Sequence, residues 1–228
     1  MRIRYKPWAR KELEESRFYR EHPEELIGKW KKEYQNPNAP FFVELGCGKG
    51  SFIAQMAVRH PENNYLAIDL VDPMLGLAKR KIEQVYKEAN KSIDNVILTR
   101  FDIECIFLIL NEYDAADGIY INFCNPWPRG KHHKKRLTYP KQLEHYKMFL
   151  KPEGKIYFKT DDDNLFEESI HYFEQSGFKI EKLTRDLREE QSFWENIETE
   201  HEKMFTEQGI LIKALIAQRK GEINGTNK

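Results

Sequence analysis

The chain has 228 residues, 40% hydrophobic and 32% charged, a balance typical of globular proteins rather than disordered or fibrous ones. This length suits one sizeable α/β domain and is short for two. No apolar run approaches the roughly 18 residues of a membrane span, no secretory signal is recognisable, and the three cysteines form no C-x-x-C pair that would indicate zinc. We therefore expect a cytoplasmic protein with no membrane segment, disulfide framework or metal site.

Predicted strands and helices alternate along most of the chain. Short apolar runs indicate strands at residues 41–45, 64–70, 95–102, 118–123, 154–160, 178–187 and 210–219. Apolar residues recur with helical spacing at 51–60, 72–90, 139–150 and 164–177. This alternation predicts an α/β fold, doubly wound around a mainly parallel seven-stranded sheet with helices on both faces. We divide the chain into a basic N-terminal extension at 1–35, one domain at 36–219 and a disordered tail at 220–228.

The charges are segregated although the formal net charge is zero, with 37 basic and 37 acidic residues. Residues 118–143 contain six basic side chains and no acidic one, and residues 1–10 contain four basic side chains, again without an acid. A single run of this kind is more often a solvated loop. Two acid-free basic segments in one neutral protein indicate a polyanionic partner.

A glycine-rich loop, "VELGCGKG", joins the predicted strand at 41–45 to the helix that follows. It reads E-x-G-x-G-x-G from Glu44, with Gly46, Gly48 and Gly50 free to turn sharply and to let a ligand lie against the backbone. A dinucleotide site usually has G-x-G-x-x-G, which places a pyrophosphate at a helix N-terminus. The different spacing, and the acid before the first glycine, favour a ligand with an ammonium or sulfonium charge.

Acidic residues follow the next two predicted strands. Asp69 ends the second strand, where a ribose diol is commonly held, and Asp102 ends the third, in a place suited to an adenine amino group. Ligands in such sheets bind beyond the carboxyl ends of the strands, so these loops should meet around one site. Glu44, the three glycines of the loop, Asp69 and Asp102 together predict an S-adenosylmethionine pocket. The alternatives are a dehydrogenase-type turn and a glycine turn without a ligand.

The segment after the fourth predicted strand combines a rigid turn with a basic arm. In Asn125-Pro126-Trp127-Pro128 the two prolines stiffen the backbone. Trp127 offers a face on which a base can stack, or else covers the core, and the amide of Asn125 can grip a purine edge. The arm that follows is expected to contact RNA phosphates through Arg129, Lys131, His132, Lys134, Lys135 and Arg136.

Four segments together carry a resemblance to a known family: "VELGCGKG", "NFCNPWPRGKHHKKRLTYP", "IYFKTDDDNLF" and "TEHEKMF". With the opening "MRIRYKPWA", in this order and spacing, they resemble the bacterial tRNA (guanine-N7-)-methyltransferases. The resemblance implies a Rossmann-like methyltransferase fold. It also implies methyl transfer from S-adenosylmethionine to N7 of a guanosine in the tRNA variable loop, position 46 of the tRNA. We expect tRNA as the partner of a monomer or homodimer.

The resemblance also implies roles for single residues. The cofactor-binding positions of the family match Glu44, Asp69, Asp102 and Asn125, beside the glycines of the loop. Its substrate contacts match Arg129, Asp161, Thr199 and Glu202, together with the basic run at 131–136. The expected catalytic set is Asn125, Asp161 and Glu202.

The sequence departs from the family pattern in three places. Asn125 stands where the family usually has Asp, the arm reads K-H-H-K-K-R rather than R-H-x-K-R-R, and His201 stands where an aromatic residue is common. N7 of guanine carries no proton, so position 125 needs only to orient the base or the cofactor. Asp161 and Glu202 then remain to offset the positive charge that develops on the purine.

Two other functions are compatible with the sequence. Asn-Pro-Pro-aromatic turns similar to "NPWP" occur in methyltransferases that act on exocyclic amines, which makes an RNA amino-methyltransferase the first alternative. The second is a non-catalytic RNA-binding module that keeps only the fold and the basic arm. Assays with adenine-rich and guanine-rich RNA separate the first from N7 methylation, and calorimetry with S-adenosylmethionine tests the second.

Overall fold

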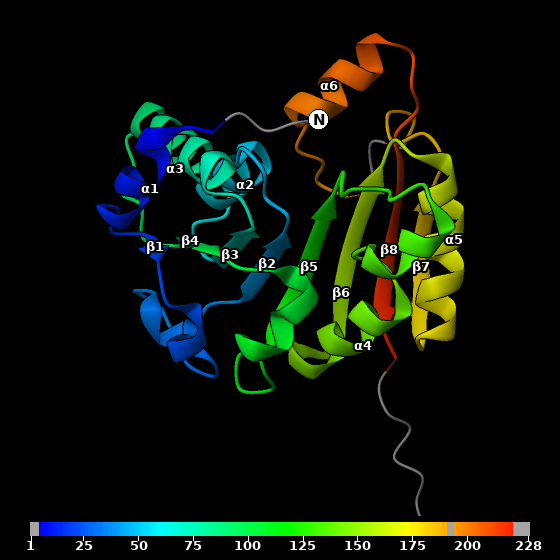
Figure 1. The fold of residues 1–228 in the computed structure, drawn as a ribbon, viewed down its shortest axis with the longest axis horizontal. Helices are drawn as coiled ribbons and strands as arrows, with labels where there is room; N and C mark the ends of the chain where they lie inside the picture. The colour runs from blue at the N-terminus through cyan, green and yellow to red at the C-terminus, as the bar shows by residue number, and fades with distance from the viewer. Residues whose placement is uncertain (1–4, 191–193, 221–228) are drawn as a thin grey trace, which may run out of the picture.

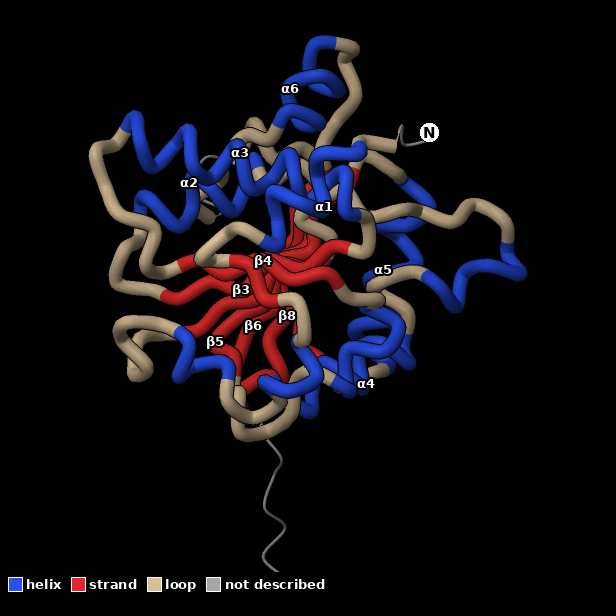
Figure 2. The backbone as a smooth tube through the Cα atoms, turned by 60° about the vertical axis from the view of Figure 1, so that its left-hand side comes forward, coloured by secondary structure: helices blue, strands red, loops and turns tan. Residues whose placement is uncertain are grey.

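The computed structural model describes residues 5–190 and 194–220, and within them eight strands form one sheet (Figures 1 and 2). The strands are β1 (Tyr19–Arg20), β2 (Phe41–Leu45), β3 (Asn64–Asp69), β4 (Val96–Arg100), β5 (Ala116–Asn122), β6 (Leu150–Thr160), β7 (Phe178–Thr184) and β8 (Lys213–Arg219). Their order across the sheet is β1-β4-β3-β2-β5-β6-β8-β7. Neighbours are parallel except around β8, which pairs antiparallel with β6 and β7.

Helices cover both faces of this sheet. They are α1 (Pro7–Glu14), α2 (Ser51–Arg59), α3 (Asp72–Glu88), α4 (Pro140–Phe149), α5 (Asp163–Gln175) and α6 (Glu200–Glu207), with short 3-10 helices at Pro23–Leu26, Trp30–Glu33, Ile103–Leu108 and Gly130–Lys135. Figure 2 shows α1, α2 and α3 on one face and α4 and α5 on the other. The α6 helix stands apart, beyond the end of the sheet where β5 and β6 finish (Figure 1). None of the described helices is long and apolar enough to cross a membrane.

Two apolar layers hold the helices against the sheet. On one face Phe158 of β6 packs against Phe166 and Phe173 of α5, and all three are fully buried. On the other face the core includes Ile53 of α2 and Ile82 of α3, also fully buried. Because both faces are covered, the strands carry near-continuous apolar runs, and polar side chains collect at their carboxyl ends.

The doubly wound, mainly parallel sheet confirms the predicted fold class, with one strand more than the seven predicted. The extra strand, β1, lies in the segment predicted as an N-terminal extension and pairs in parallel with β4 at the sheet edge. Its two residues are too few to show a periodic pattern. The division of the chain at residue 35 stays a prediction, and the predicted tail lies outside the described residues except for Lys220.

The short helix α6 was not predicted from the sequence, which indicated only a polar segment at 188–208. Thr199 forms its N-cap, with the side-chain hydroxyl accepting a hydrogen bond from the backbone N–H of Glu202 at 3.1 Å. Glu202 is the one buried residue of α6. Phe205, which is half-buried, supplies an apolar contact with the cluster that contains Leu187 and Ile212, so α6 is held by one polar and one apolar side chain.

Candidate active site

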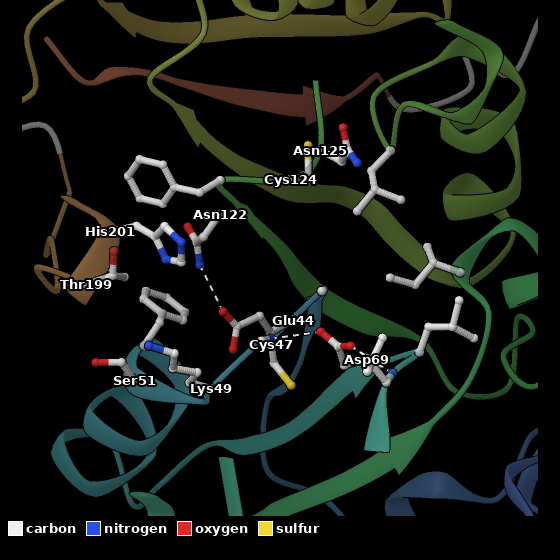
Figure 3. A pocket seen from close by; sticks show the side chains of 18 of the residues that line it. Glu44, Cys47, Lys49, Ser51, Asp69, Asn122, Cys124, Asn125, Thr199 and His201 are labelled. Carbon is white, nitrogen blue, oxygen red and sulfur yellow. Dashed lines mark hydrogen bonds between the residues drawn. The ribbon is translucent and has the colours of Figure 1, made fainter. Parts of the chain in front are cut away.

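A cavity of about 470 Å³ lies at the carboxyl ends of β2, β3, β4 and β5 (Figure 3). The loops after these four strands line it, together with Thr199 and the first residues of α6. This volume falls within the roughly 300–1,000 Å³ of small-molecule sites, and the position is the one expected for a ligand in a parallel α/β sheet. Among the residues that the structure describes, no cluster of His, Cys, Asp or Glu side chains is suited to a metal ion.

The glycine loop forms one wall of this cavity. Gly48 has a φ of +52°, and a Cβ placed on it would meet no atom within 4 Å, so the loop leaves open space on the cavity side. Gly50 has a φ of +73°, and a Cβ there would lie 2.7 Å from the Cβ of Ala78. Gly48 thus leaves room for a ligand against the backbone, and Gly50 allows the start of α2 to pack against α3.

Glu44 is a buried acid with half of its carboxylate unpaired. Its side chain enters the cavity from the end of β2, and Asn122 of β5 donates a hydrogen bond to Oε1 at 3.1 Å (Figure 3). The second oxygen, Oε2, is buried without a partner in the described part of the chain. Burial raises the pKa of Glu44 to about 7, against the opposing effects of the Asn122 bond and the Lys159 charge. A buried acceptor of this kind fits the ammonium group of an amino-acid ligand.

Asp69 and Asp102 lie at the same cavity, as the sequence predicts. The carboxylate of Asp69 is fixed by two backbone N–H groups, those of Gly48 at 2.9 Å and Val71 at 3.0 Å. Each oxygen keeps a second lone pair for a ligand hydroxyl, and burial raises the pKa of this group. Asp102 lies at the rim, where one oxygen accepts from the backbone of Glu104.

The Asn125–Trp127 turn forms another wall of the cavity. The Asn125 carbonyl oxygen accepts a hydrogen bond from the backbone N–H of Trp127 at 3.0 Å, and Trp127 has a φ of +43°, which is uncommon for a residue other than glycine. The Trp127 ring is half-buried and carries the Lys135 ammonium at 5.1 Å from its centre. It lines the cavity and is absent from the core clusters of the described residues, which speaks against a role as a cover of the core; stacking on a base stays a prediction.

The basic arm divides into exposed and buried charges. Arg129, Lys131 and Lys134 are exposed, whereas His132 and Lys135 are half-buried. Arg136 is fully buried, and its guanidinium donates to the Pro126 carbonyl at 2.8 Å and, at 2.7 Å each, to Glu168 and Asn164 of α5. The expectation that Arg136 contacts RNA is therefore wrong for this structure, because these acceptors hold the guanidinium inside the fold.

The remaining predicted residues come from the ends of β6 and α6. Thr199 lines the cavity, whereas Asp161 and Glu202 do not belong to its lining. The Glu202 side chain is buried and bonded to the Lys159 ammonium at 2.6 Å. Asp161 is half-buried directly after β6, and burial raises its pKa. The predicted direct contact of these two carboxylates with a substrate base is not matched by their positions here.

Several cavity residues were not predicted. Lys49 of the glycine loop forms an ion pair with Glu200 of α6 at 2.9 Å, across the cavity. Phe123 lies at the end of β5 with its ring nearly parallel to that of His201, 6.2 Å between centres. Asn122 was recognisable as a polar residue at the end of a buried strand. The ion pair and the ring pair join segments far apart in sequence and leave no local signal.

Comparisons with known proteins agree with this geometry. A family model described as "Putative methyltransferase" matches residues 38–215. A "tRNA (guanine-N(7)-)-methyltransferase" from Clostridium beijerinckii is 56% identical over 96% of this chain and 99% of its own length, and one from Acetivibrio thermocellus is 49% identical over 96% and 100%. The chain belongs to the tRNA (guanine-N(7)-)-methyltransferase family. The family resemblance seen in the sequence motifs is thereby confirmed.

Solved structures support the fold of this family member. The "16S rRNA Methyltranferase KamB" matches with a TM-score of 0.57 and 14% identity, covering 79% of this chain and 88% of that one. An "Antibiotic Related Methyltransferase" matches with a TM-score of 0.54 and 19% identity, covering 78% and 86%. At these identities the likeness concerns the fold alone, and it confirms the predicted Rossmann-like methyltransferase architecture.

Proposed function

We propose that this protein transfers the methyl group of S-adenosylmethionine to N7 of a guanosine in the tRNA variable loop, at position 46. The observation that carries the proposal is one cavity with two different walls. The glycine loop, Glu44 and Asp69 form a wall suited to the cofactor, and Asn125 with Trp127 forms a wall suited to a nucleic-acid base. Exposed basic side chains continue from the second wall. The curated relatives carry the name of this activity.

The residues of the first wall suit the amino acid and ribose parts of the cofactor. The unpaired Oε2 of Glu44 would accept from the ammonium group, and the oriented carboxylate of Asp69 would accept from the ribose hydroxyls. Asp102 at the rim would accept from the adenine amino group. When bound, S-adenosylmethionine supplies a methyl group on a sulfonium centre. The protein's task is then to orient an acceptor atom toward that group.

N7 of guanine suits the second wall because it is a lone-pair acceptor without a proton. No general base is needed, and none of the residues at Asn125–Trp127 supplies one. An exocyclic amine, in the alternative reaction, must give up a proton toward an acceptor such as the Asn125 carbonyl. That side-chain oxygen, Oδ1, already accepts one hydrogen bond from the Trp127 backbone N–H and has one lone pair left, so the 7-deazaguanosine comparison below decides between the two reactions. The side-chain N–H2 of Asn125 remains a donor, which suits O6 of guanine, the acceptor next to N7, and leaves the N7 lone pair free to attack the methyl group.

A purely RNA-binding role accounts poorly for Glu44. Keeping an unpaired carboxylate oxygen buried costs stability, because burial disfavours the charged form. An RNA-binding module would gain nothing from this cost. A cofactor site gains selectivity for a ligand with a positive charge.

The basic arm is proposed to position the tRNA without reading its sequence. Arg129, Lys131 and Lys134 project from a short 3-10 helix or its start, and no acidic residue lies between Gly118 and Leu143. Phosphate contacts of this type fix orientation and make binding dependent on salt. Arg136 supports them from inside, through its bonds to Pro126 and α5.

Replacement of a single atom in the substrate tests this function. Two tRNA transcripts are compared, one with guanosine and one with 7-deazaguanosine, in which a C–H group takes the place of N7. We expect methyl incorporation into the first transcript and none into the second. Equal incorporation into both would assign the reaction to another atom, with an exocyclic amine as the first candidate.

A further inference from the structure

Lys159, the penultimate residue of β6, is a fully buried cation directly behind the cavity. Its ammonium group lies 5.8 Å from the ring centre of Phe52 and 5.6 Å from that of Phe123, and both rings line the cavity. Burial lowers the pKa of Lys159, against the opposing effect of the Glu202 carboxylate. A lysine ammonium has three N–H donors, and a buried one needs an acceptor for each.

All three acceptors come from the segment that leads into α6. The ammonium donates to the Asn196 side chain at 2.8 Å, to the Ile197 carbonyl at 3.0 Å and to the Glu202 carboxylate at 2.6 Å. Asn196 in turn donates to the other carboxylate oxygen of Glu202. The ammonium therefore ties the approach to α6 and its first turn to the end of β6.

Residues 199–201, which lie between the Lys159 partners Ile197 and Glu202, face the cavity. Thr199, Glu200 and His201 line it, while Ile197 and Glu202 on either side of them bind Lys159. Figure 3 shows Thr199 and His201 on the cavity wall contributed by α6. The position of this wall is thus set by the contacts behind it.

A second ionic contact between α6 and the cavity, the Lys49–Glu200 pair, is weaker, and Phe205 of α6 adds an apolar contact with Phe123. The Lys49 and Glu200 side chains are 45% and 54% exposed, whereas those of Lys159 and Glu202 are 0% and 4% exposed. Exposed ion pairs contribute little to stability because water and salt screen them. Removing one partner of a buried pair is strongly destabilising, because it leaves the other charge buried and unpaired. The buried Lys159–Glu202 pair is therefore the stronger of the two ionic contacts that hold the first turn of α6.

We propose that Lys159 is a positioning residue for methyl transfer, which fixes the first turn of α6 so that Thr199 and His201 meet the substrate base at a set place in the cavity. In this role Glu202 is the anchor for Lys159 and does not itself act on the base. The proposal rests on the function proposed above and adds a residue to it. Misplacement of a substrate by about 1 Å can cost on the order of a hundredfold in rate, which makes the position of this wall important.

Three variants test the proposal. Lys159→Met with Glu202→Met removes both buried charges together, a change that is often neutral for stability. Glu202→Gln keeps an acceptor for Lys159 but removes the carboxylate charge. Lys155→Met with Glu181→Met is the matched control, because it removes an ion pair of 2.8 Å between Lys155 of the same strand, β6, and Glu181 of β7, outside the cavity lining.

We expect the Lys159 double variant to keep its melting temperature and to lose about a hundredfold or more in kcat for tRNA methylation at saturating S-adenosylmethionine. Glu202→Gln should stay within about tenfold of wild type, and the control should match wild type. A folded Lys159 double variant with wild-type kcat would overturn the proposal. So would a Glu202→Gln variant that is as inactive as the double variant while its amide exchange at residues 199–207 matches wild type, because the carboxylate itself would then act on the substrate.

Amide hydrogen exchange of residues 199–207 supplies a readout that needs no substrate. Exchange should be at least about tenfold faster in the Lys159 double variant than in wild type and unchanged in the control, because local opening controls exchange. Unchanged exchange would refute the anchoring role of Lys159. If the wild-type protein forms no N7-methylguanosine, the proposed function fails, while the exchange measurement still decides whether Lys159 positions α6.

Discussion

The unpaired oxygen of Glu44 makes a prediction in which stability and cofactor binding change in opposite directions. Glu44→Gln keeps the shape of the side chain and an acceptor for Asn122, but removes the charge. In wild type, a pKa raised from 4.5 to about 7 means that the folded state holds the proton more tightly than the unfolded state. The stability from Glu44 is therefore fully present below about pH 4.5 and is lost as the pH rises through about 7. The loss amounts to about 3 kcal/mol.

Above about pH 7 the Glu44→Gln variant should consequently be more stable than wild type, by up to about 3 kcal/mol, and lose this advantage toward about pH 5. Its affinity for S-adenosylmethionine should fall by about 1.5–3 kcal/mol, roughly 10- to 150-fold, because a charge-assisted hydrogen bond is lost. Wild-type affinity should rise about tenfold per pH unit up to about pH 7, as Glu44 must ionise to pair with the ammonium group. The variant should lack this dependence.

Isothermal calorimetry at several pH values measures the affinity, and urea unfolding without cofactor measures the stability. Calorimetry in buffers of different ionisation enthalpy also counts the proton that wild type should release on binding below about pH 7. The reasoning is refuted if Glu44→Gln binds the cofactor as tightly as wild type, or if both proteins show the same pH dependence. A variant less stable than wild type at about pH 8 would contradict the predicted cost of the buried charge.

Three further predictions concern other parts of the site. Asn125→Asp should keep kcat/KM within about tenfold, since a carboxylate also accepts the backbone bond of 3.0 Å, whereas Asn125→Ala should lose more in a tRNA methylation assay. Lys131→Ala with Lys134→Ala should reduce the slope of log affinity for tRNA against log salt concentration by about 2, as measured by binding titrations. Arg136→Met should leave that slope unchanged and lower the free energy of unfolding in urea by about 3–5 kcal/mol. Asp69→Ala should weaken S-adenosylmethionine binding by about 2–3 kcal/mol in calorimetry, and an unchanged binding curve would remove Asp69 from the site.

The sheet and the cofactor wall could be predicted because their signals are local. Apolar runs at 41–45 and 64–70 mark the strands observed at Phe41–Leu45 and Asn64–Asp69. Parallel strands place their carboxyl ends at one edge, so Glu44 and Asp69 had to come together once the strands were recognised. Residues that directly follow neighbouring parallel strands can therefore be assigned to one site from the sequence alone.

The basic arm and α6 could not be placed in this way. Nothing near Arg136 in the sequence distinguishes it from the other basic residues of the arm. Its side chain is buried because Glu168 and Asn164 of α5 accept its hydrogen bonds. Likewise, Glu202 belongs to a polar segment without helical periodicity. It becomes buried only because Lys159, 43 positions earlier in the chain, supplies a matching charge. Partners remote in sequence decide which charges of a polar segment reach solvent.

Chemical mapping of the methylated nucleotide tests the central claim most directly. Wild-type protein is incubated with S-adenosylmethionine and a tRNA mixture that lacks N7-methylguanosine, and the RNA is then treated with borohydride and aniline, which cleave at that nucleotide. We predict cleavage at one guanosine in the variable loop, dependent on both protein and cofactor. Methyl incorporation without cleavage, or cleavage only outside the variable loop, would contradict the proposed activity.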